Sequence, residues 1–238
     1  MLSTKGEEIM KRIVGRKMVD DQTTTYGSYK LVPKDPRNII VGNQLFRFRW
    51  TSDFIDILRA NGSMCYNYLD IGSYTGELPV IVAKKSLNNN PEVESNETIC
   101  VDAIELHKES FDSLNETARM AREMGLKLTA HNVKFEDYKT DKTYDMITAF
   151  EVVEHMRDPM FCIEKMYDML EIGGHLLITV PEESGVFGLK DKNPFHYWTS
   201  TVQSLVFFFH DSNKWKILQV FVDSDIIHMQ LQKKTYQM

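Results

Sequence analysis

The sequence has few cysteines and no long hydrophobic run. Cys65, Cys100 and Cys162 lie far apart without a CxxC pair, so neither a disulfide framework nor a zinc ribbon is expected, and a reducing compartment is the default. No apolar segment approaches the ~20 residues that a membrane helix requires; the best candidate, residues 204–209, is far shorter. The first residues lack the apolar core of a secretory signal. We therefore expect a cytoplasmic protein without a membrane span.

The chain also lacks a surplus of basic residues. Its net charge is −6 over 238 residues, a length that suits one sizeable core and not two domains. Residues 1–50 contain ten Lys or Arg and five Asp or Glu, which makes this segment +5 and the remainder −11. An acidic body disfavours broad binding to a nucleic-acid backbone. The basic segment is compatible with an anionic ligand, and equally with a solvated arm.

Apolar segments of strand length alternate with segments of helical periodicity. Strands are expected at residues 65–72, 98–106, 126–133, 144–150, 175–182, 214–224 and 225–234, and helices at 50–60, 75–87, 108–125, 157–174 and 199–210. Thr51 or Ser52 would cap the first helix, Asn61-Gly62 would stop it, and the pair Gly173-Gly174 would end the fourth. This order predicts an α/β fold with a mostly parallel seven-stranded sheet, helices on both faces and an antiparallel C-terminal hairpin. Residues 1–60 are interpreted as an N-terminal extension with a cap helix, and residues 61–238 as one ligand-binding domain. Its ligands should bind beyond the carboxyl ends of the strands.

The first strand ends in "LDIGSYTGE", residues 69–77, where Gly72 and Gly76 frame a turn into a helix. Such a turn lets a ligand approach the backbone beside helical N–H donors. The pattern is D-x-G-x-x-x-G and differs from the G-x-G-x-x-G of dinucleotide-binding proteins. "LDIGSYTG" resembles the first motif of class I S-adenosylmethionine-dependent methyltransferases, although an ordinary strand–helix turn would carry similar glycines.

The resemblance implies two further cofactor-binding positions. In the family an acidic residue after the second strand binds the ribose hydroxyls. We assign Glu105 of "IELHKES" to this role, while Asp102 remains an alternative. In "VKFEDY" the loop after the third strand would hold the adenine ring, with Phe135 and Glu136 preferred and Asp137 as a rival. The complete set that the resemblance assigns to S-adenosylmethionine is Asp70, Gly72, Ser73, Gly76, Glu105, Leu106, Phe135, Glu136 and Phe150.

Ionisable residues follow the fourth strand in "YDMITAFEVVEHMRDP". With its surroundings this segment is similar to the ubiquinone-biosynthesis O-methyltransferase type, which carries Glu-x-x-Glu-His here. A similar cluster with a later histidine occurs in small-RNA 3′-terminal 2′-O-methyltransferases, and in both groups it is associated with a divalent metal. Glu151, Glu154 and His155 are therefore the candidate catalytic residues, and with His196 they form a candidate site for Mg²⁺, Mn²⁺ or Zn²⁺. Without a metal, His155 could be a general base, and a purely structural role remains open, including a Glu154–Arg157 pair.

These motifs do not define the methyl acceptor. Aromatic side chains flank the expected pocket and could form an apolar lid or simple packing: Phe46, Phe48, Trp50, Phe187, Phe195, Tyr197 and Trp198. The first hypothesis is O-methylation of a small-molecule hydroxyl. The alternatives are an RNA-end 2′-O-methyltransferase, which the acidic body disfavours, and a non-catalytic cofactor-binding protein. The sequence carries no signal for the oligomeric state.

Overall fold

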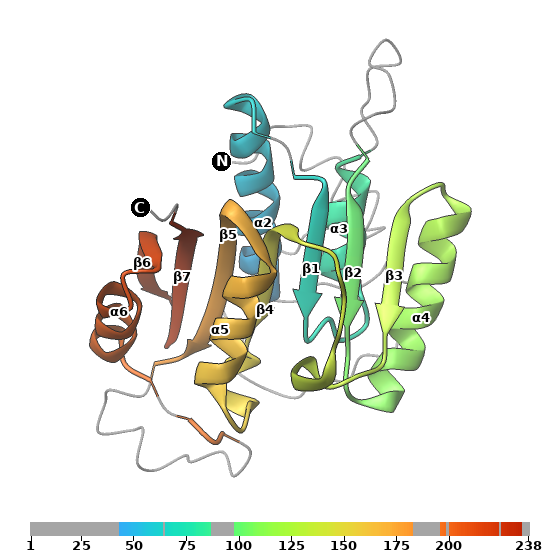
Figure 1. Cartoon of the computed structure of the whole chain (residues 1–238). Helices are drawn as coiled ribbons and strands as arrows, with labels where there is room; N and C mark the ends of the chain where they lie inside the picture. The colour runs from blue at the N-terminus through green and yellow to red at the C-terminus, as the bar shows by residue number, and fades with distance from the viewer. Residues whose placement is uncertain are drawn as a thin grey trace, which may run out of the picture.

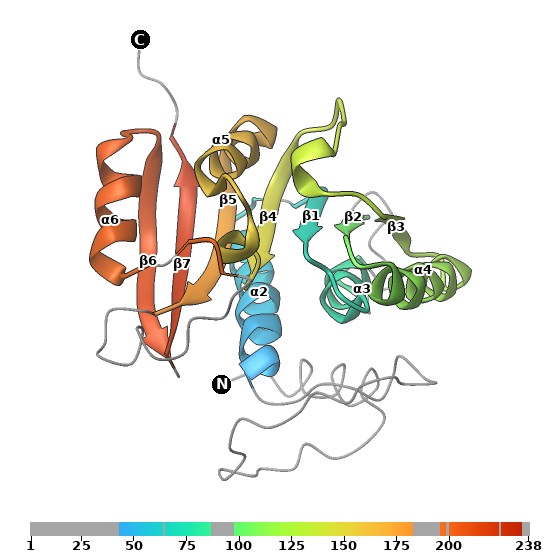
Figure 2. The ribbon, with the colours of Figure 1, turned by 90° about the horizontal axis from the view of Figure 1, so that it is seen from below.

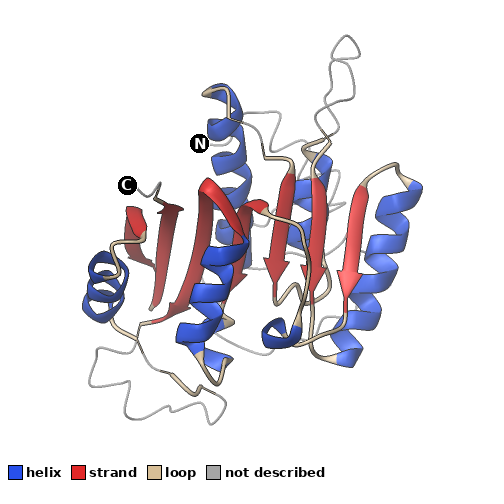
Figure 3. Cartoon of the chain, viewed as in Figure 1, coloured by secondary structure: helices blue, strands red, loops and turns tan. Residues whose placement is uncertain are grey.

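The computed structural model describes residues 43–63, 65–86, 98–182, 196–198, 200–223 and 225–234. Its strands form one sheet (Figure 1): β1 (Asn67–Ile71), β2 (Cys100–Ile104), β3 (Lys127–His131), β4 (Tyr144–Phe150), β5 (Leu170–Pro181), β6 (Trp215–Asp223) and β7 (Ile226–Lys233). The helices (Figure 3) are α2 (Asn43–Ala60), α3 (Glu77–Lys84), α4 (Lys108–Glu123), α5 (Pro159–Met169) and α6 (Val202–Asp211), with short 3₁₀ turns η1 (Phe135–Asp137) and η2 (Val153–His155). None of these helices combines the length and apolar character that a membrane span requires.

The strand order is β3-β2-β1-β4-β5-β7-β6. β1 to β5 are parallel, and β7 pairs antiparallel with both β5 and β6. The predicted fold, with its antiparallel C-terminal pair, is thus confirmed. Because the chain order reverses between β1 and β4, their carboxyl ends form the switch point at which open α/β sheets bind ligands.

Helices cover both faces of the sheet. Figure 2 shows α2, α3 and α4 on one side and α5 on the other. Alternate residues of β1 enter opposite cores: Tyr68 packs with the α2–α4 layer, and Leu69 packs with the layer that contains α5 and α6. Both side chains are fully buried. Burial on both faces explains why the strands are apolar without strict alternation.

The helix expected at residues 157–174 is shorter than predicted. α5 ends at Met169, and Leu170 already belongs to β5, where it pairs with Tyr144. Gly173 has φ +81°, and a Cβ on Gly174 would lie 2.8 Å from the Glu171 carbonyl oxygen. The two glycines therefore belong to the early part of the strand, where the backbone turns sharply, and do not cap the helix.

The helix expected at residues 50–60 is longer than predicted, because α2 begins at Asn43. Thr51 and Ser52, the two residues considered as its cap, both lie inside the helix, and the Thr51 hydroxyl donates to the Arg47 carbonyl. The end at Ala60 agrees with the predicted stop, since Gly62 adopts φ +76° there. The additional turns place Arg47 and Phe48 beside the carboxyl end of the sheet.

Candidate active site

A cavity of about 960 Å³ lies at the carboxyl ends of β1, β2 and β4, closed on one side by α2. Most of the residues assigned to the cofactor line it: Asp70, Gly72, Ser73, Glu105, Leu106, Phe135, Glu136 and Phe150. Of the candidate catalytic residues, Glu151 and His155 also line it. Segments far apart in the sequence therefore meet in one space, large enough for a nucleoside cofactor beside a small acceptor.

The glycine turn after β1 approaches its neighbours closely. The amides of Gly72 and Ser73 both donate to the Ile104 carbonyl at 2.9 Å, which fastens the turn to the end of β2. Gly72 has φ +74°, and a Cβ there would lie 2.3 Å from Cγ2 of Val152. Gly76 also requires its small size, but for packing: a Cβ would lie 2.7 Å from Leu114 on α4. Gly76 is not among the residues that line the cavity.

Asp70 is buried at the base of this turn. Its Oδ1 accepts a hydrogen bond of 2.5 Å from the Thr148 hydroxyl, which also lies 2.6 Å from the Tyr68 hydroxyl. Burial raises the pKa of Asp70 to about 7, although the hydrogen bonds from Thr148 and Ser73 oppose this shift. Asp70 therefore joins β1 to β4 while it lines the cavity.

Glu105 and Asp102 have different surroundings. The Glu105 carboxylate is 5% exposed and accepts the Tyr74 amide at 2.9 Å and the His107 amide at 2.8 Å. Asp102 faces a separate depression, where His131 and Lys142 donate to it at 2.8 and 2.7 Å. Burial would raise the pKa of Asp102, but these two donors outweigh it and hold the pKa below its usual range. Of these two acids, only Glu105 lines the large cavity.

The loop after β3 is held by one lysine. Lys165 of α5 donates to the carbonyls of Phe135, Glu136 and Tyr138 at 2.6–2.8 Å. Phe135 and Glu136 line the cavity, whereas their rival Asp137 faces the separate depression beside Asp102. Phe150 also lines the cavity and stacks on Trp50 of α2 with ring centroids 6.0 Å apart. The cavity therefore has aromatic side chains in its lining, which could border a planar ring.

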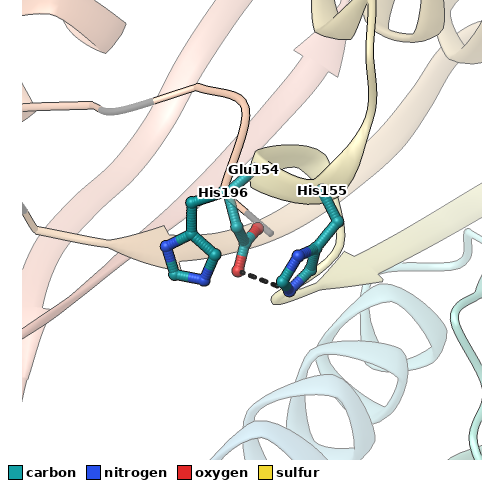
Figure 4. A group of neighbouring side chains, drawn as sticks. All are labelled: Glu154, His155 and His196. Atoms are coloured by element: carbon teal, nitrogen blue, oxygen red, sulfur yellow. Dashed lines mark ion pairs between the residues drawn. The ribbon is translucent and has the colours of Figure 1, made fainter. Parts of the chain in front are cut away.

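Glu154, His155 and His196 come together beside the cavity (Figure 4). One donor atom from each of the three lies within 4.8 Å of the others. Glu154 is 2% exposed, and its carboxylate is 3.9 Å from Nε2 of His155, whose side chain is 42% exposed. The Tyr197 amide donates to the Glu154 carbonyl at 2.8 Å, which fastens the His196 segment to η2. Residues 41 positions apart in the sequence thus form one group of donors.

Glu151 does not belong to this group. Its carboxylate lies 3.5 Å from the guanidinium of Arg47 on α2. Arg47, Tyr74 and Arg157 also line the cavity, and the sequence motifs did not indicate them. A basic pair with aromatic neighbours, "FRFRW", was the available signal for Arg47. Of the expected aromatic lid, Phe48 and Tyr197 line the cavity, while Phe187 and Phe195 lie outside the described residues.

A family model for the methyltransferase domain matches residues 30–218. The ubiquinone biosynthesis O-methyltransferase of Vibrio parahaemolyticus serotype O3:K6 (strain RIMD 2210633) is 30% identical over 124 residues, which are 51% of this chain and 46% of that protein. The chain thus spans about half the length of the curated relatives it matches.

Two solved structures support the fold. An S-adenosylmethionine-dependent methyltransferase from Clostridium acetobutylicum ATCC 824 has a TM-score of 0.60 at 13% identity, with 81% of this chain and 96% of that one covered. The plantazolicin methyltransferase BpumL, in complex with monoazolic desmethylPZN analog and SAH, has a TM-score of 0.59 at 13% identity, with 80% and 84% covered. The chain therefore belongs to the methyltransferase-domain family, and its fold is that of the solved S-adenosylmethionine-dependent methyltransferase from Clostridium acetobutylicum.

Proposed function

We propose that the chain binds S-adenosylmethionine in the large cavity and methylates a hydroxyl group of a small molecule. Glu105 would hold the ribose, the Gly72 turn would accommodate the cofactor backbone, and Phe135 and Glu136 would border the adenine. The observation that carries the proposal is the Glu154–His155–His196 group, whose member His155 opens into the same cavity. A hydroxyl acceptor needs help to lose its proton near neutral pH, and this group can provide it.

The donor set fits a divalent cation. One buried carboxylate and two imidazoles offer the mixed oxygen and nitrogen ligands that Mn²⁺ or Zn²⁺ accepts, and Mg²⁺ with more water. When bound, such a cation lowers the pKa of a coordinated hydroxyl. Glu154, His155 and His196 would hold it, and the Tyr197–Glu154 backbone bond would keep His196 in place. The curated relative's printed activity, O-methylation, agrees with a hydroxyl acceptor.

His155 can also act directly. Its half-exposed imidazole lines the cavity, and imidazole is a side chain that commonly accepts protons in catalysis. In this step the imidazole takes the proton of the acceptor hydroxyl. The oxygen lone pair then attacks the methyl carbon, and the carbon–sulfur bond breaks to leave S-adenosylhomocysteine. Both routes place the acceptor hydroxyl beside His155.

A second candidate is methylation of the 2′-hydroxyl at an RNA end. The inclusion of His196 in the group favours it, because the small-RNA enzymes that the sequence resembles carry such a later histidine. The net charge of −6 counts against a long RNA footprint. The third candidate is a non-catalytic cofactor-binding protein. Such a protein would not require a proton acceptor in the cavity.

Transfer of labelled methyl from S-adenosylmethionine into fractionated cell extract separates these candidates. We expect label in the small-molecule fraction and a fall of about 10²–10⁴-fold in rate for H155A. Label confined to RNA would replace the first candidate by the second. Loss of transfer with EDTA, restored by Mn²⁺, would support a cation, whereas indifference to EDTA would leave His155 as the base. Binding of S-adenosylhomocysteine without any transfer would favour the third candidate.

A further inference from the structure

Glu151 stands three residues before Glu154 at the end of β4, yet its carboxylate is directed elsewhere. Instead of meeting Glu154, His155 and His196, it approaches Arg47 of α2, with Oε1 3.5 Å from a terminal guanidinium nitrogen. Both Glu151 and Arg47 line the cavity that His155 also lines. The cavity is therefore lined both by His155 of the candidate cation-binding group and by Glu151, whose carboxylate lies outside that group.

The backbone of Glu151 is fixed. Its φ is +53°, a left-handed conformation that is uncommon for a residue other than glycine or asparagine. Its amide donates to both the carbonyl and the hydroxyl of Thr179 on β5, at 3.0 and 3.1 Å. A strained backbone conformation of this kind persists only where surrounding contacts impose it, and such conformations are more frequent at functional sites. Only the side-chain torsions of Glu151 remain to redirect its carboxylate.

The Arg47–Glu151 ion pair is incompletely formed. Nε of Arg47 and Oε1 of Glu151 are both buried without a hydrogen-bond partner, and the side chains are only 12% and 27% exposed. A separation of 3.5 Å exceeds the range of a good N–H···O bond. A desolvated pair is stabilising only when its geometry and remaining hydrogen bonds are good. The pair is therefore a weak restraint on the Glu151 carboxylate.

We propose that Arg47 and the Glu154–His155–His196 group compete for Glu151. Arg47 is a positioning residue: its ion pair keeps Glu151 out of the group and so lowers the affinity of the group for a divalent cation. When the pair is released, Glu151 turns toward the group as a fourth ligand. This inference rests on the cation-assisted form of the proposed function.

Mn²⁺ titration of the full chain, followed by the EPR signal of free Mn²⁺, tests the competition. We expect R47M to bind Mn²⁺ at least about threefold more tightly than the wild type, because the competing pair is lost. E151Q should bind no more tightly than the wild type, and R47M/E151Q should bind like E151Q. R49M removes a charge from the same helix at a residue that does not line the cavity, and it should bind like the wild type.

The double variant separates ligation from general electrostatics. If R47M tightens binding equally with and without Glu151, simple removal of positive charge explains the effect and the proposal is overturned. It is also overturned if R47M binds no more tightly, or if no variant binds Mn²⁺. Calorimetric binding of S-adenosylhomocysteine by the same samples reports on folding and on the methyltransferase assignment independently. Failure of the inference is thereby distinguished from failure of the proposed function.

Discussion

At the scale of single residues, substitutions of Glu105 and Asp102 test which of the two carboxylates binds the cofactor. Both carboxylates are buried, but only Glu105 lines the large cavity. In E105Q the amide keeps the size of the side chain and loses the charge that accepts two backbone amides and, under the proposed function, the ribose hydroxyls. We expect S-adenosylhomocysteine to bind about 10–100-fold more weakly, measured by calorimetry.

D102N is the matched control. It weakens the bonds from His131, Lys142 and Tyr144, so the free energy of unfolding should fall by about 1–3 kcal/mol in urea titrations. The affinity for S-adenosylhomocysteine should remain close to that of the wild type. The opposite pattern, with affinity lost in D102N and kept in E105Q, would transfer the ribose role to Asp102.

Gly72 and Gly62 share a positive φ and differ in their surroundings. A Cβ at Gly72 would meet Val152 at 2.3 Å, whereas nothing lies within 4 Å of one at Gly62. G62A should cost only the left-handed strain, about 1–2 kcal/mol of unfolding free energy. G72A adds a clash in the cavity wall, so we expect a total loss above about 2 kcal/mol and weakened cofactor binding.

Urea unfolding and calorimetry of both variants check this difference. A second substitution, V152A, should restore part of the stability of G72A because it removes the atom that the new Cβ would meet. Equal losses in G62A and G72A would mean that backbone strain alone makes Gly72 necessary.

Most of the residues that the sequence motifs assign to the cofactor line the cavity, because these motifs occupy fixed positions around strand ends. Glu105, Phe135 and Glu136 line the cavity, while the weighed alternatives Asp102 and Asp137 face elsewhere. The direction of the Glu151 side chain was not predictable. It depends on the left-handed backbone of Glu151, on the hydrogen bond from its amide to Thr179 of β5 and on its ion pair with Arg47 of α2. No local sequence pattern encodes these three features.

At the scale of elements, α2 covers two buried histidines. His175 of β5 makes an edge contact with Phe54 at 4.8 Å, and His228 of β7 makes edge contacts with Phe46 and Trp50. Burial lowers the pKa of each to about 4, with the charge of Arg47 adding to the shift at His228 and Asp223 opposing it. Nδ1 of each ring is buried without a hydrogen-bond partner, so neither ring can be charged in place at low cost.

These shifts predict a loss of stability in mild acid. An unfolded histidine binds a proton near pH 6.5, while the folded one binds it only near pH 4. The stabilisation by the neutral rings is therefore complete above about pH 6.5 and falls as the pH drops toward 4. At pH 5 we expect a loss of about 1–2 kcal/mol for each ring, measured as the change in unfolding free energy from pH 7.

The H175F/H228F variant should lose less stability than the wild type between pH 7 and pH 5. Asp70, whose pKa is raised to about 7, has the opposite dependence, but it is present in both proteins and cancels in the comparison. H210F removes an exposed histidine and should follow the wild type. The same acid-induced loss in H175F/H228F and the wild type would contradict the role of the two rings.

Element boundaries were less predictable than the elements themselves. Periodicity predicts a helix from residue 157, and a glycine pair commonly ends a helix, but Gly173 and Gly174 lie within β5. Thr51 suits a helix cap by its chemistry, yet α2 begins earlier and the Thr51 hydroxyl bonds within the helix. Such choices are decided by packing against the sheet, which local sequence does not contain.

At the scale of the whole molecule, alternation of strands and helices was sufficient to predict the sheet. Parallel strands need crossover helices, and two closing strands without a helix between them must pair antiparallel. The position of the cavity followed, since the order reverses between β1 and β4. What alternation did not reveal is that α2 contributes to the cavity wall through Arg47 and Phe48.

Because the cavity joins both halves of the sheet with α2, a bound cofactor should stabilise the entire chain. A ligand that binds only the folded state, at about 100 times its dissociation constant, adds about 2.7 kcal/mol to the free energy of unfolding. For a chain of 238 residues this corresponds to a Tm increase of about 5–11 °C with S-adenosylhomocysteine, measured by calorimetry or fluorescence. E105Q at the same ligand concentration should show a much smaller increase, whereas D102N should begin from a lower Tm and keep the full increase. An unchanged Tm in the wild type would contradict the assignment of the cavity to the cofactor, because no binding to the folded state could then be taking place.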